Sequence, residues 1–419
     1  MIKNIIILQK QELDSKAKER YIMRKSDFGK TASSMIKVII GPRRAGKSFF
    51  AVHFLKAQGN FGYVNFDDEQ LAEAEDYDEI VNAMNSVYGN PKTVLFDEIQ
   101  NLPKWELFAN RLQRQGYNLV ITGSNSKLLS KELAAHLTGR HFLINIFPFS
   151  FREYLNFVKG ETGRDLTTSE IKEKLSEYIV YGGYPEPLVK KMDYKEYLST
   201  LFNSIVYKDI VKRHRIRFAN EIEDMAFYLL SNIASEYSYN SLAKVTKIKS
   251  VHTLQKYAGY LEEAFIFFSI SRFSYKVKEQ ISSIKKLYCF DNGFVYSKAF
   301  QGSPNEGKLY ENAVASELKK EEMDNKLSVY YWKNVQQEEV DFVVKKGTKV
   351  VQLIQVCFDV RNPKAKDREV RALIKASKEL KCKDLLVITE NYSAEESKQW
   401  FGMKGKIKFV PLHKWLLEG

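Results

Sequence analysis

The segment GPRRAGKS, residues 41–48, constrains the fold of this chain more than any other stretch. It fits the pattern G-x-x-x-x-G-K-[S/T] and lies between an apolar run, MIKVII, and an amphipathic run, SFFAVHFLKA. Glycines at positions 41 and 46 let backbone N–H groups surround a phosphate, and a helix that begins near Lys47 adds its positive N-terminal dipole. The pattern therefore predicts a phosphate-binding loop between a buried strand and a helix.

This loop also predicts the ligands. Lys47 would reach the β- and γ-phosphates of ATP, and Ser48 would be a ligand of Mg²⁺. The residues expected to surround the nucleotide are Gly41, Pro42, Arg43, Arg44, Ala45, Gly46, Lys47, Ser48 and Phe49.

Two acidic residues end a second apolar run, TVLFDE, at residues 93–98. Asp97 would hold Mg²⁺ through its water shell, and Glu98 would polarise the attacking water. An acidic strand end is common by itself. Combined with the phosphate loop, it predicts ATP hydrolysis with Lys47, Asp97 and Glu98 as catalytic residues.

Polar residues near two further strand ends have two interpretations each. In ITGSNS, Ser124 or Asn125 would contact the γ-phosphate or the water, or would simply form a polar turn. Arg140, in LTGRH, would act as a catalytic arginine on the γ-phosphate of a neighbouring subunit, which implies a homo-oligomer of unspecified size. A structural ion pair is the alternative for Arg140.

Apolar runs and helical patterns alternate between residues 35 and 147, which is typical of a parallel α/β sheet. The expected strands are residues 35–40, 61–66, 93–98, 117–122 and 141–147. Pro148 interrupts the pattern. A chain of 419 residues is too long for one core, so further domains are expected after this sheet.

The order of these motifs resembles an AAA+ ATPase. More specifically, it is similar to the archaeal and bacterial AAA-like ATPases whose C-terminal half is a domain of unknown function. The shared motifs are GPRRAGKS, FDD, LFDEIQ, TGS, L-x-GR followed by FPFSFREYL, GGYPEP, KDIV, ENAVASEL and EVDFVV. The resemblance implies nucleotide contacts at Gly41, Gly46, Lys47 and Ser48, catalytic acids at Asp97 and Glu98, and an arginine finger at Arg140. It implies no particular biological role.

Composition adds three expectations. The net charge of +13 favours a polyanionic partner such as DNA, although a well-solvated lysine-rich surface explains it equally well. Cys289, Cys357 and Cys382 have no zinc spacing and indicate no disulfide framework, so we expect a reducing cytoplasm. No stretch approaches the roughly 18 apolar residues that a membrane span needs, so no membrane association is expected.

Residues 224–300 resemble a winged helix, with three helical patterns followed by two strands. The third helix, KSVHTLQKYAGYLEEA, would enter the major groove of DNA. The residues expected to contact DNA are Lys247, Lys249, His252, Lys256, Lys276 and Lys278. Neutralising about six phosphates would give a log–log salt slope near −5. Winged helices also mediate protein contacts, so a packing module is the alternative.

Residues 301–419 resemble the PD-(D/E)xK nuclease fold, in which a helix Glu and two strand acids gather around Mg²⁺. The matching acids are Glu311, in LYENAVASEL, and Asp341, in EEVDFVV. Gln355 and Cys357 stand where the Glu and Lys of Glu-x-Lys are expected. An amide holds a hard cation weakly and a neutral thiol supplies no positive charge, so we expect a degenerate site.

Nuclease activity would require a nearby lysine, such as Lys345 or Lys364, to take the place of the missing Lys.

The strand DLLVIT (384–389) is expected to lead into a helical end.

The sequence therefore predicts a cytoplasmic α/β protein with four parts. These are a P-loop AAA-like ATPase domain at 1–150, a helical connection at 151–223, the winged-helix-like domain at 224–300 and the nuclease-like domain at 301–419. The expected function is Mg²⁺-dependent ATP hydrolysis coupled to DNA binding or remodelling. Two alternatives stay open: a nucleotide-gated switch that acts on a protein partner, and an ATP-regulated DNA nuclease.

Overall fold

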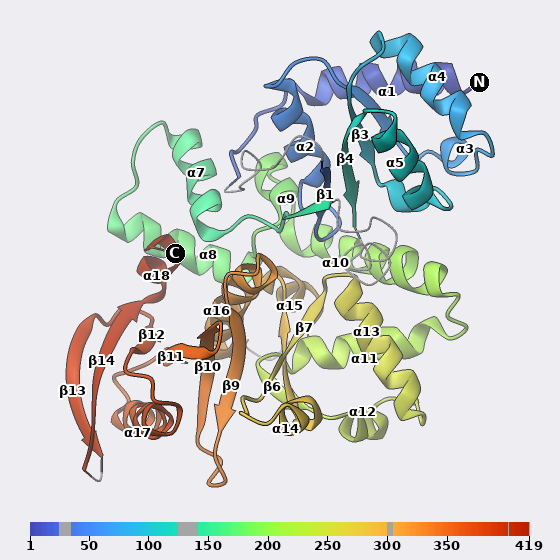
Figure 1. Cartoon of the computed structure of the whole chain (residues 1–419). Coiled ribbons are helices and arrows are strands. Elements are labelled where there is room, and N and C mark those ends of the chain that lie inside the picture. Colours follow the sequence, from blue (N-terminus) through green and yellow to red (C-terminus); the bar gives the residue numbers. More distant parts are fainter. Residues whose placement is uncertain (25–34, 125–140, 300–304, 401, 419) are drawn as a thin grey trace. The chain divides into compact units, whose positions relative to one another are not determined.

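The computed structural model describes residues 1–24, 35–124, 141–299, 305–400 and 402–418. The chain divides into two compact units, which are Met1–Pro148 with Glu263–Phe265, and Phe149–Glu262 with Ile266–Gly419. Both units combine helices and strands, and the first contains an all-parallel sheet (Figure 1). The predicted α/β class is confirmed at this level.

A five-stranded parallel sheet forms the centre of the first unit. Its strands are β1 (Ile36–Ile40), β2 (Gly62–Asn65), β3 (Thr93–Asp97), β4 (Asn118–Gly123) and β5 (His141–Asn145). They lie in the order β2-β3-β4-β1-β5. Strands β1, β3 and β4 are buried along nearly their whole length, as expected for a sheet covered on both faces. Because all five are parallel, the segments that follow β1, β3 and β4 meet at one edge of the sheet.

The helices of the first unit are α1 (Ile2–Lys16), α2 (Lys47–Lys56), α3 (Glu69–Ala72), α4 (Tyr77–Tyr88), the short 3₁₀ turn η2 (Ile99–Asn101) and α5 (Trp105–Arg114). Helix α1 buries Ile2, Ile6 and Leu13 and packs on α4 and β2. The side chain of Gln9 both donates to and accepts from the backbone of Asn65, which anchors α1 to the end of β2.

Helices dominate the first part of the second unit. They are α7 (Phe151–Thr162), α8 (Thr168–Tyr181), α9 (Pro185–Lys190), α10 (Tyr194–Ser204), the π-helical segment η4 (Ile205–Lys212) and α11 (Ala219–Ser231). Helix α11 crosses the boundary that we predicted between residues 223 and 224. The reason is that its buried stripe begins at Ile222 and continues through Met225, Ala226 and Leu229, at helical spacing.

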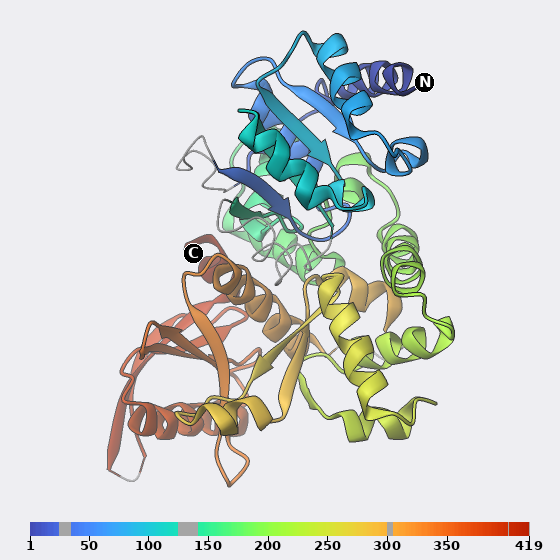
Figure 2. The ribbon, with the colours of Figure 1, turned by 45° about the vertical axis from the view of Figure 1, so that its right-hand side comes forward.

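A small three-stranded sheet follows. It contains β6 (Ser235–Tyr237), β7 (Phe267–Ser271) and β8 (Lys285–Cys289), in the order β6-β8-β7, and all pairs are antiparallel. Helices α12 (Tyr239–Val245) and α13 (Val251–Glu263) lie between β6 and β7 in the chain, and α14 (Val277–Ser282) lies between β7 and β8. This segment is the yellow part of Figure 2. Residues 235–237, which we expected to be helical, form β6.

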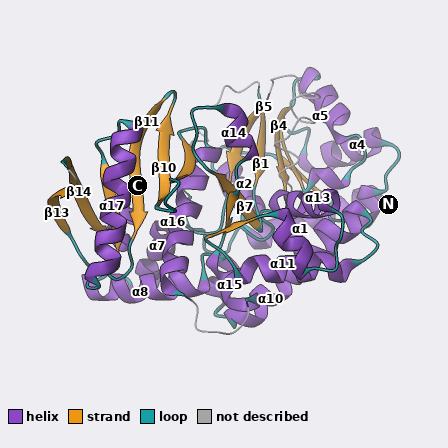
Figure 3. Cartoon of the chain, turned by 90° about the horizontal axis from the view of Figure 1, so that it is seen from below, coloured by secondary structure: helices purple, strands orange, loops and turns teal. Residues whose placement is uncertain are grey.

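A six-stranded sheet with the order β13-β14-β12-β11-β10-β9 organises the C-terminal part. Its strands are β9 (Ser328–Lys333), β10 (Glu339–Lys346), β11 (Lys349–Val356), β12 (Leu385–Thr389), β13 (Ala394–Trp400) and β14 (Met403–Pro411). The helices are α15 (Asn292–Lys298), α16 (Glu306–Met323), α17 (Pro363–Leu380) and α18 (Leu412–Glu418). Figure 3 shows β10 and β11 between α16 and α17.

Strands β9, β10 and β11 form an antiparallel meander, whereas β11, β12 and β14 pair in parallel. Val343, Leu353, Leu373 and Phe409 are among the buried side chains between this sheet and α17. The hairpin β13–β14 was not predicted. Its first strand alternates exposed polar residues with half-buried ones and has little apolar character. Among the described residues, no helix has both the length and the apolar character that a bilayer crossing requires.

Candidate functional site

The phosphate loop connects β1 to α2, as the sequence predicts. Gly41 has φ +150°, and a Cβ atom there would lie 1.8 Å from the carbonyl oxygen of Ile146, so no other residue fits without displacing the backbone. Gly46 has φ +95° and is the residue immediately before α2. The two glycines thus set the loop's path between the strand and the helix, with the first N–H groups of α2 at its end.

Lys47 lies inside this loop with its side chain 3% exposed. Its Nζ donates to the carbonyl oxygens of Gly41, at 3.1 Å, and Pro42, at 2.9 Å. The same Nζ is 3.9 Å from Oε1 of Glu98. The ammonium group therefore lies between the loop and the end of β3, and two loop carbonyl oxygens accept its hydrogen bonds. Arg43 is half-buried and Arg44 is exposed.

Asp97 is buried at the end of β3, and three hydroxyl groups donate to its carboxylate. Oδ1 accepts from Ser48 Oγ at 2.8 Å and from Thr122, and Oδ2 accepts from the Tyr63 hydroxyl at 3.1 Å. Burial and the nearby charge of Glu98 raise the pKa of Asp97, and the three hydrogen bonds oppose that shift. Ser48 and Asp97, which come from different elements, are brought together as predicted.

Glu98 follows β3 in the left-handed region, with φ +49°. Its backbone N–H donates to Thr122 Oγ1 at 3.1 Å, and its carboxylate accepts from the Gln100 side chain. Burial opposes ionisation of Glu98, but Lys47, Gln100 and Arg43 lower its pKa below the ordinary value. Glu98 is therefore an ionised carboxylate beside Lys47, next to a buried Asp97 whose pKa is raised.

A magnesium ion that accompanies a nucleotide fits this arrangement. A hydroxyl and a carboxylate are hard oxygen ligands, and Mg²⁺ usually takes only one or two from the protein, the others being water and phosphate. The Ser48–Asp97 pair at 2.8 Å meets that need. Within the part of the chain that the structure describes, no group of three or more His, Cys, Asp or Glu residues could hold a metal ion.

Two of these hydroxyl contacts were not anticipated from the sequence. Tyr63 lies in β2 and Thr122 in β4, on either side of β3. In the sequence, each is a polar side chain inside an otherwise apolar strand. That pattern points to Asp97 only when the order of the strands in the sheet is known. Ser124, which directly follows β4, is buried. Asn125 and Arg140 lie outside the described residues.

An aromatic group lies on α2 beside the loop. Phe49, one of the predicted nucleotide-contacting residues, packs on His53 with ring centroids 4.6 Å apart. Tyr21 stacks on the same imidazole at 4.4 Å, with an angle of 9° between the planes. Arg24, from the same N-terminal segment, donates to the carbonyl oxygens of Ala45 and Phe147.

The predicted DNA-contacting residues gather around α13 and α14. Lys247, Lys249, His252 and Lys256 are exposed on α13 or just before it, and Lys276 and Lys278 are exposed at the start of α14. Ser250 caps the start of α13 by accepting from the backbone N–H of Thr253 at 3.3 Å. Lys276 pairs with Glu279 at 2.9 Å, so part of its charge is neutralised within the chain.

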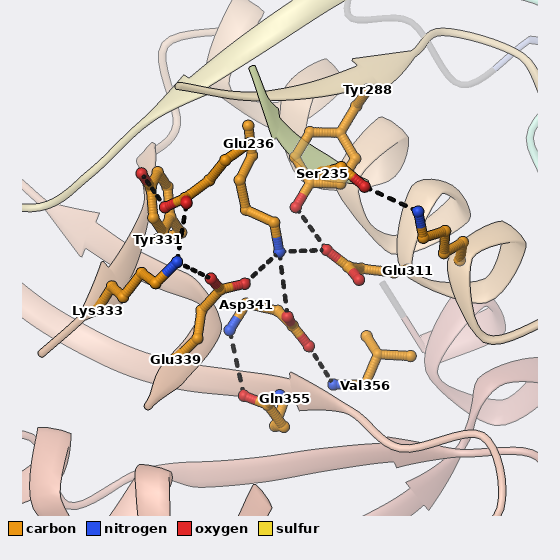
Figure 4. A network of polar contacts seen from close by, with 12 residues as sticks. Ser235, Glu236, Tyr288, Glu311, Tyr331, Lys333, Glu339, Asp341, Gln355 and Val356 are labelled. Carbon is orange, nitrogen blue, oxygen red and sulfur yellow. Dashed lines mark hydrogen bonds and ion pairs between the residues drawn. The ribbon is translucent and has the colours of Figure 1, made fainter. Parts of the chain in front are cut away.

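The predicted nuclease-like residues converge at one end of the C-terminal sheet. Glu311 from α16 and Asp341 from β10 point toward each other, and Glu339 from β10 joins them (Figure 4). We call these three carboxylates the acidic cluster. Gln355 in β11 is next to it, because its Oε1 accepts from the backbone N–H of Asp341 at 3.1 Å.

Cys357 is buried just after β11, and burial with the nearby charge of Glu369 raises the pKa of its thiol to about 11. The cation of the acidic cluster is Lys286 from β8, which contacts all three carboxylates. The alternative that Lys345 or Lys364 supplies the missing positive charge stays a prediction. Lys345 is half-buried in β10, and Lys364 is exposed in the first turn of α17. The sequence held no local signal for Lys286, because it belongs to a different sheet.

Comparison with protein families divides the chain into three consecutive segments. Residues 33–155 match the family model described as AAA domain. Residues 150–304 match a domain of unknown function, DUF8612, and residues 306–415 match another, DUF4143. The AAA-domain match covers the phosphate loop, Asp97 at the end of β3 and Glu98 just after it, and it supports a P-loop ATPase.

Two curated relatives span almost the whole chain. The uncharacterized protein MJ1544 of Methanocaldococcus jannaschii is 35% identical, over 98% of this chain and 94% of its own length. This chain belongs to the same family. An uncharacterized protein of Haemophilus influenzae is 30% identical, over 82% of this chain and 87% of its own length. Family membership thus extends through all three segments, not only the ATPase-like one.

Among solved structures, the Walker-type ATPase PABY2304 of Pyrococcus abyssi is similar with a TM-score of 0.42 and 17% sequence identity. The similarity covers 62% of this chain and 90% of that one.

Proposed function

We propose that this protein is a Mg²⁺-dependent ATPase whose nucleotide cycle is coupled to DNA binding by its second unit. The observation that carries the ATPase assignment is the convergence of Lys47, Ser48, Asp97 and Glu98 at one edge of the parallel sheet. The AAA-domain match supports it. Each of the four side chains has a chemical role in phosphoryl transfer to water.

Lys47 is placed to exchange its two carbonyl partners for phosphate oxygens when ATP enters the loop. Its fixed positive charge then offsets negative charge that develops on the γ-phosphoryl group. Ser48 and Asp97 would hold Mg²⁺, which when bound neutralises phosphate charge and orients the triphosphate. Glu98, ionised at neutral pH, would accept a hydrogen bond from the attacking water and orient it.

The DNA assignment has separate support. The order α11-β6-α12-α13-β7-α14-β8, with β8 between β6 and β7, is compatible with a winged helix and supports the proposed DNA contact, although β6 was not expected. The exposed lysines around α13 would neutralise backbone phosphates, and the sequence-wide charge of +13 would add long-range attraction. In the nuclease-like part, the order α16-β9-β10-β11-α17-β12 supports the predicted fold, and Gln355 with Cys357 supports loss of its chemistry.

ATPase rates with and without duplex or single-stranded DNA test this proposal. Lys47→Ala should abolish turnover, because the variant loses the buried ammonium group that lies between the loop carbonyls and Glu98. Glu98→Gln should retain ATP binding and reduce turnover by about 10²-fold or more. DNA should raise the wild-type rate.

Normal turnover in Lys47→Ala or Glu98→Gln would contradict the ATPase assignment. ATP binding with turnover that DNA leaves unchanged would instead favour a nucleotide-gated switch for a protein partner. Lys172→Ala, which removes an exposed lysine from α8 of the second unit, is a control that should leave all rates unchanged.

A further inference from the structure

Lys286 is a buried lysine surrounded by carboxylates. Its side chain is only 4% exposed, and its Nζ lies 2.7 Å from Glu311, 2.6 Å from Glu339 and 3.4 Å from Asp341. The four residues come from three elements, because Lys286 belongs to β8, Glu311 to α16 and the other two to β10. One ammonium group thus joins the small sheet to the C-terminal sheet.

The electrostatics of this contact keep the lysine charged. A buried ammonium group costs several kcal/mol unless it is paired, and three carboxylates pair with this one. Burial by itself lowers the pKa of Lys286, but Glu311 and the other acids raise it well above the ordinary value. Burial and the charge of Glu311 raise the pKa of Asp341.

Each carboxylate of the acidic cluster also has a partner other than Lys286. The Tyr288 hydroxyl donates to Glu311 at 2.7 Å, and the backbone N–H of Val356 donates to Oδ2 of Asp341 at 2.9 Å. Lys333 pairs with Glu236 at 2.8 Å and with Glu339 at 3.7 Å. Figure 4 shows that these partners surround the carboxylates from several elements.

Gln355 is also committed within the protein. Its Oε1 accepts from Asp341 N, and its Nε2 donates to Glu369 of α17. The amide that replaces the expected acid therefore connects β10 to α17 and has no role in holding a cation. Gln355 and Lys286 are therefore both bonded to Asp341, the first through its backbone N–H and the second through its carboxylate.

We propose that Lys286 is a built-in cation that takes the place of a divalent metal between Glu311 and Asp341, so that the nuclease-like part is closed to metal and serves as a structural joint. This inference does not rest on the proposed ATPase activity. It does explain how the acidic residues can persist together although the Glu-x-Lys positions hold Gln and Cys. The contact between the small sheet and the C-terminal sheet would then depend on the charge of Lys286 and would need no metal ion.

Mn²⁺ titration of the nucleotide-free full-length chain, followed by calorimetry, tests the proposal. The wild type should take up no Mn²⁺ at the acidic cluster. Lys286→Ala, which removes the ammonium group that contacts all three carboxylates, should gain one Mn²⁺ site that the wild type lacks. The double variant Lys286→Ala/Asp341→Asn should lose that site again, which locates it at the cluster.

A thermal melt gives a second readout. About 1 mM Mn²⁺ should raise the melting temperature of Lys286→Ala by several degrees and leave that of the wild type unchanged, because binding stabilises only the state that has the site. Lys286→Arg retains the positive charge and should behave as the wild type in both measurements.

Two results would overturn the proposal. One is a wild-type Mn²⁺ site that Asp341→Asn removes, since a metal would then coexist with Lys286. The other is a folded Lys286→Ala protein that gains no site. If Lys286→Ala does not fold, Lys286→Met should be used with the same double variant, and recovery of folding by Asp341→Asn would support the charge pairing.

Discussion

At the residue scale, Thr122 shows how one hydroxyl can hold two neighbouring acidic residues, Asp97 and Glu98. It donates to the carboxylate of Asp97 and accepts from the backbone N–H of Glu98, with the latter bond 3.1 Å long. Thr122 itself is fully buried. The two acids are adjacent in sequence but have opposite pKa shifts. Burial raises the pKa of both, but at Glu98 the nearby Lys47 and the hydrogen bond from Gln100 outweigh it. Thr122 sets the backbone position from which Glu98 projects.

We predict that Thr122→Val lowers the ATPase kcat by roughly tenfold, equivalent to about 1.4 kcal/mol in the activation barrier. Valine has nearly the same shape but leaves the Glu98 N–H without its acceptor and removes one of the two hydroxyl donors to Asp97 Oδ1, the other being Ser48. Thr122→Ser retains the hydroxyl and should restore most of the rate. Steady-state kinetics check this, and an unchanged kcat in Thr122→Val would show that Glu98 needs no such support.

At the element scale, the turn after α8 depends on two adjacent glycines in YGGYPEP. Gly182 has φ +76°, and a Cβ atom there would lie 1.8 Å from Oδ1 of Asp291. That carboxylate accepts from the backbone N–H groups of Gly183, at 2.8 Å, and Gly293, at 2.9 Å. Burial raises the pKa of Asp291 to about 6. The motif therefore joins α8 to the start of α15 through a buried carboxylate.

Replacing Gly182 by alanine should destabilise the second unit by roughly 3 kcal/mol or more. The new methyl group meets Asp291, and alanine is strained at positive φ. Urea unfolding measures the change. A matched control is Gly259→Ala in the middle of α13, where a Cβ atom meets nothing within 4 Å. That variant should be neutral or more stable by up to about 1 kcal/mol, because alanine favours a helix. Equal effects of the two variants would contradict this account.

At the scale of the whole molecule, an excess of 13 positive charges acts on any polyanion near the protein. Net charge explains attraction but not location. We propose the exposed lysines around α13 as the location, whereas other lysines form ion pairs, as Lys333 does with Glu236 and Lys366 with Glu396. The positions of the exposed lysines therefore matter more for where a polyanion binds than the net charge does.

If α13 contacts DNA, Lys256→Ala should weaken duplex binding and reduce the magnitude of the log–log salt slope by about 1. Lys346→Ala removes an equally exposed lysine at the tip of the β10–β11 hairpin and should leave the slope unchanged. Fluorescence anisotropy across a salt series measures both. Identical slopes for the two variants would favour a protein partner for this segment.

The sequence by itself determined the nucleotide site. Its glycines, lysine and serine are neighbours in the chain, and Asp97 with Glu98 ends a strand whose parallel pairing brings them to the same edge. Local patterns suffice there because each residue's position follows from the element that carries it. The strand positions of the first unit and the helices around α13 were foreseeable for the same reason.

Only the tertiary structure decided the partners that come from elsewhere. Tyr63 and Thr122 reach Asp97 because β2 and β4 flank β3, and Lys286 reaches Glu311 and Asp341 because two separate sheets meet. A buried charge must find its counter-ion, but the sequence does not state which of 65 Lys and Arg residues lies within reach. Distance in space settles that choice, and distance along the chain carries no information about it.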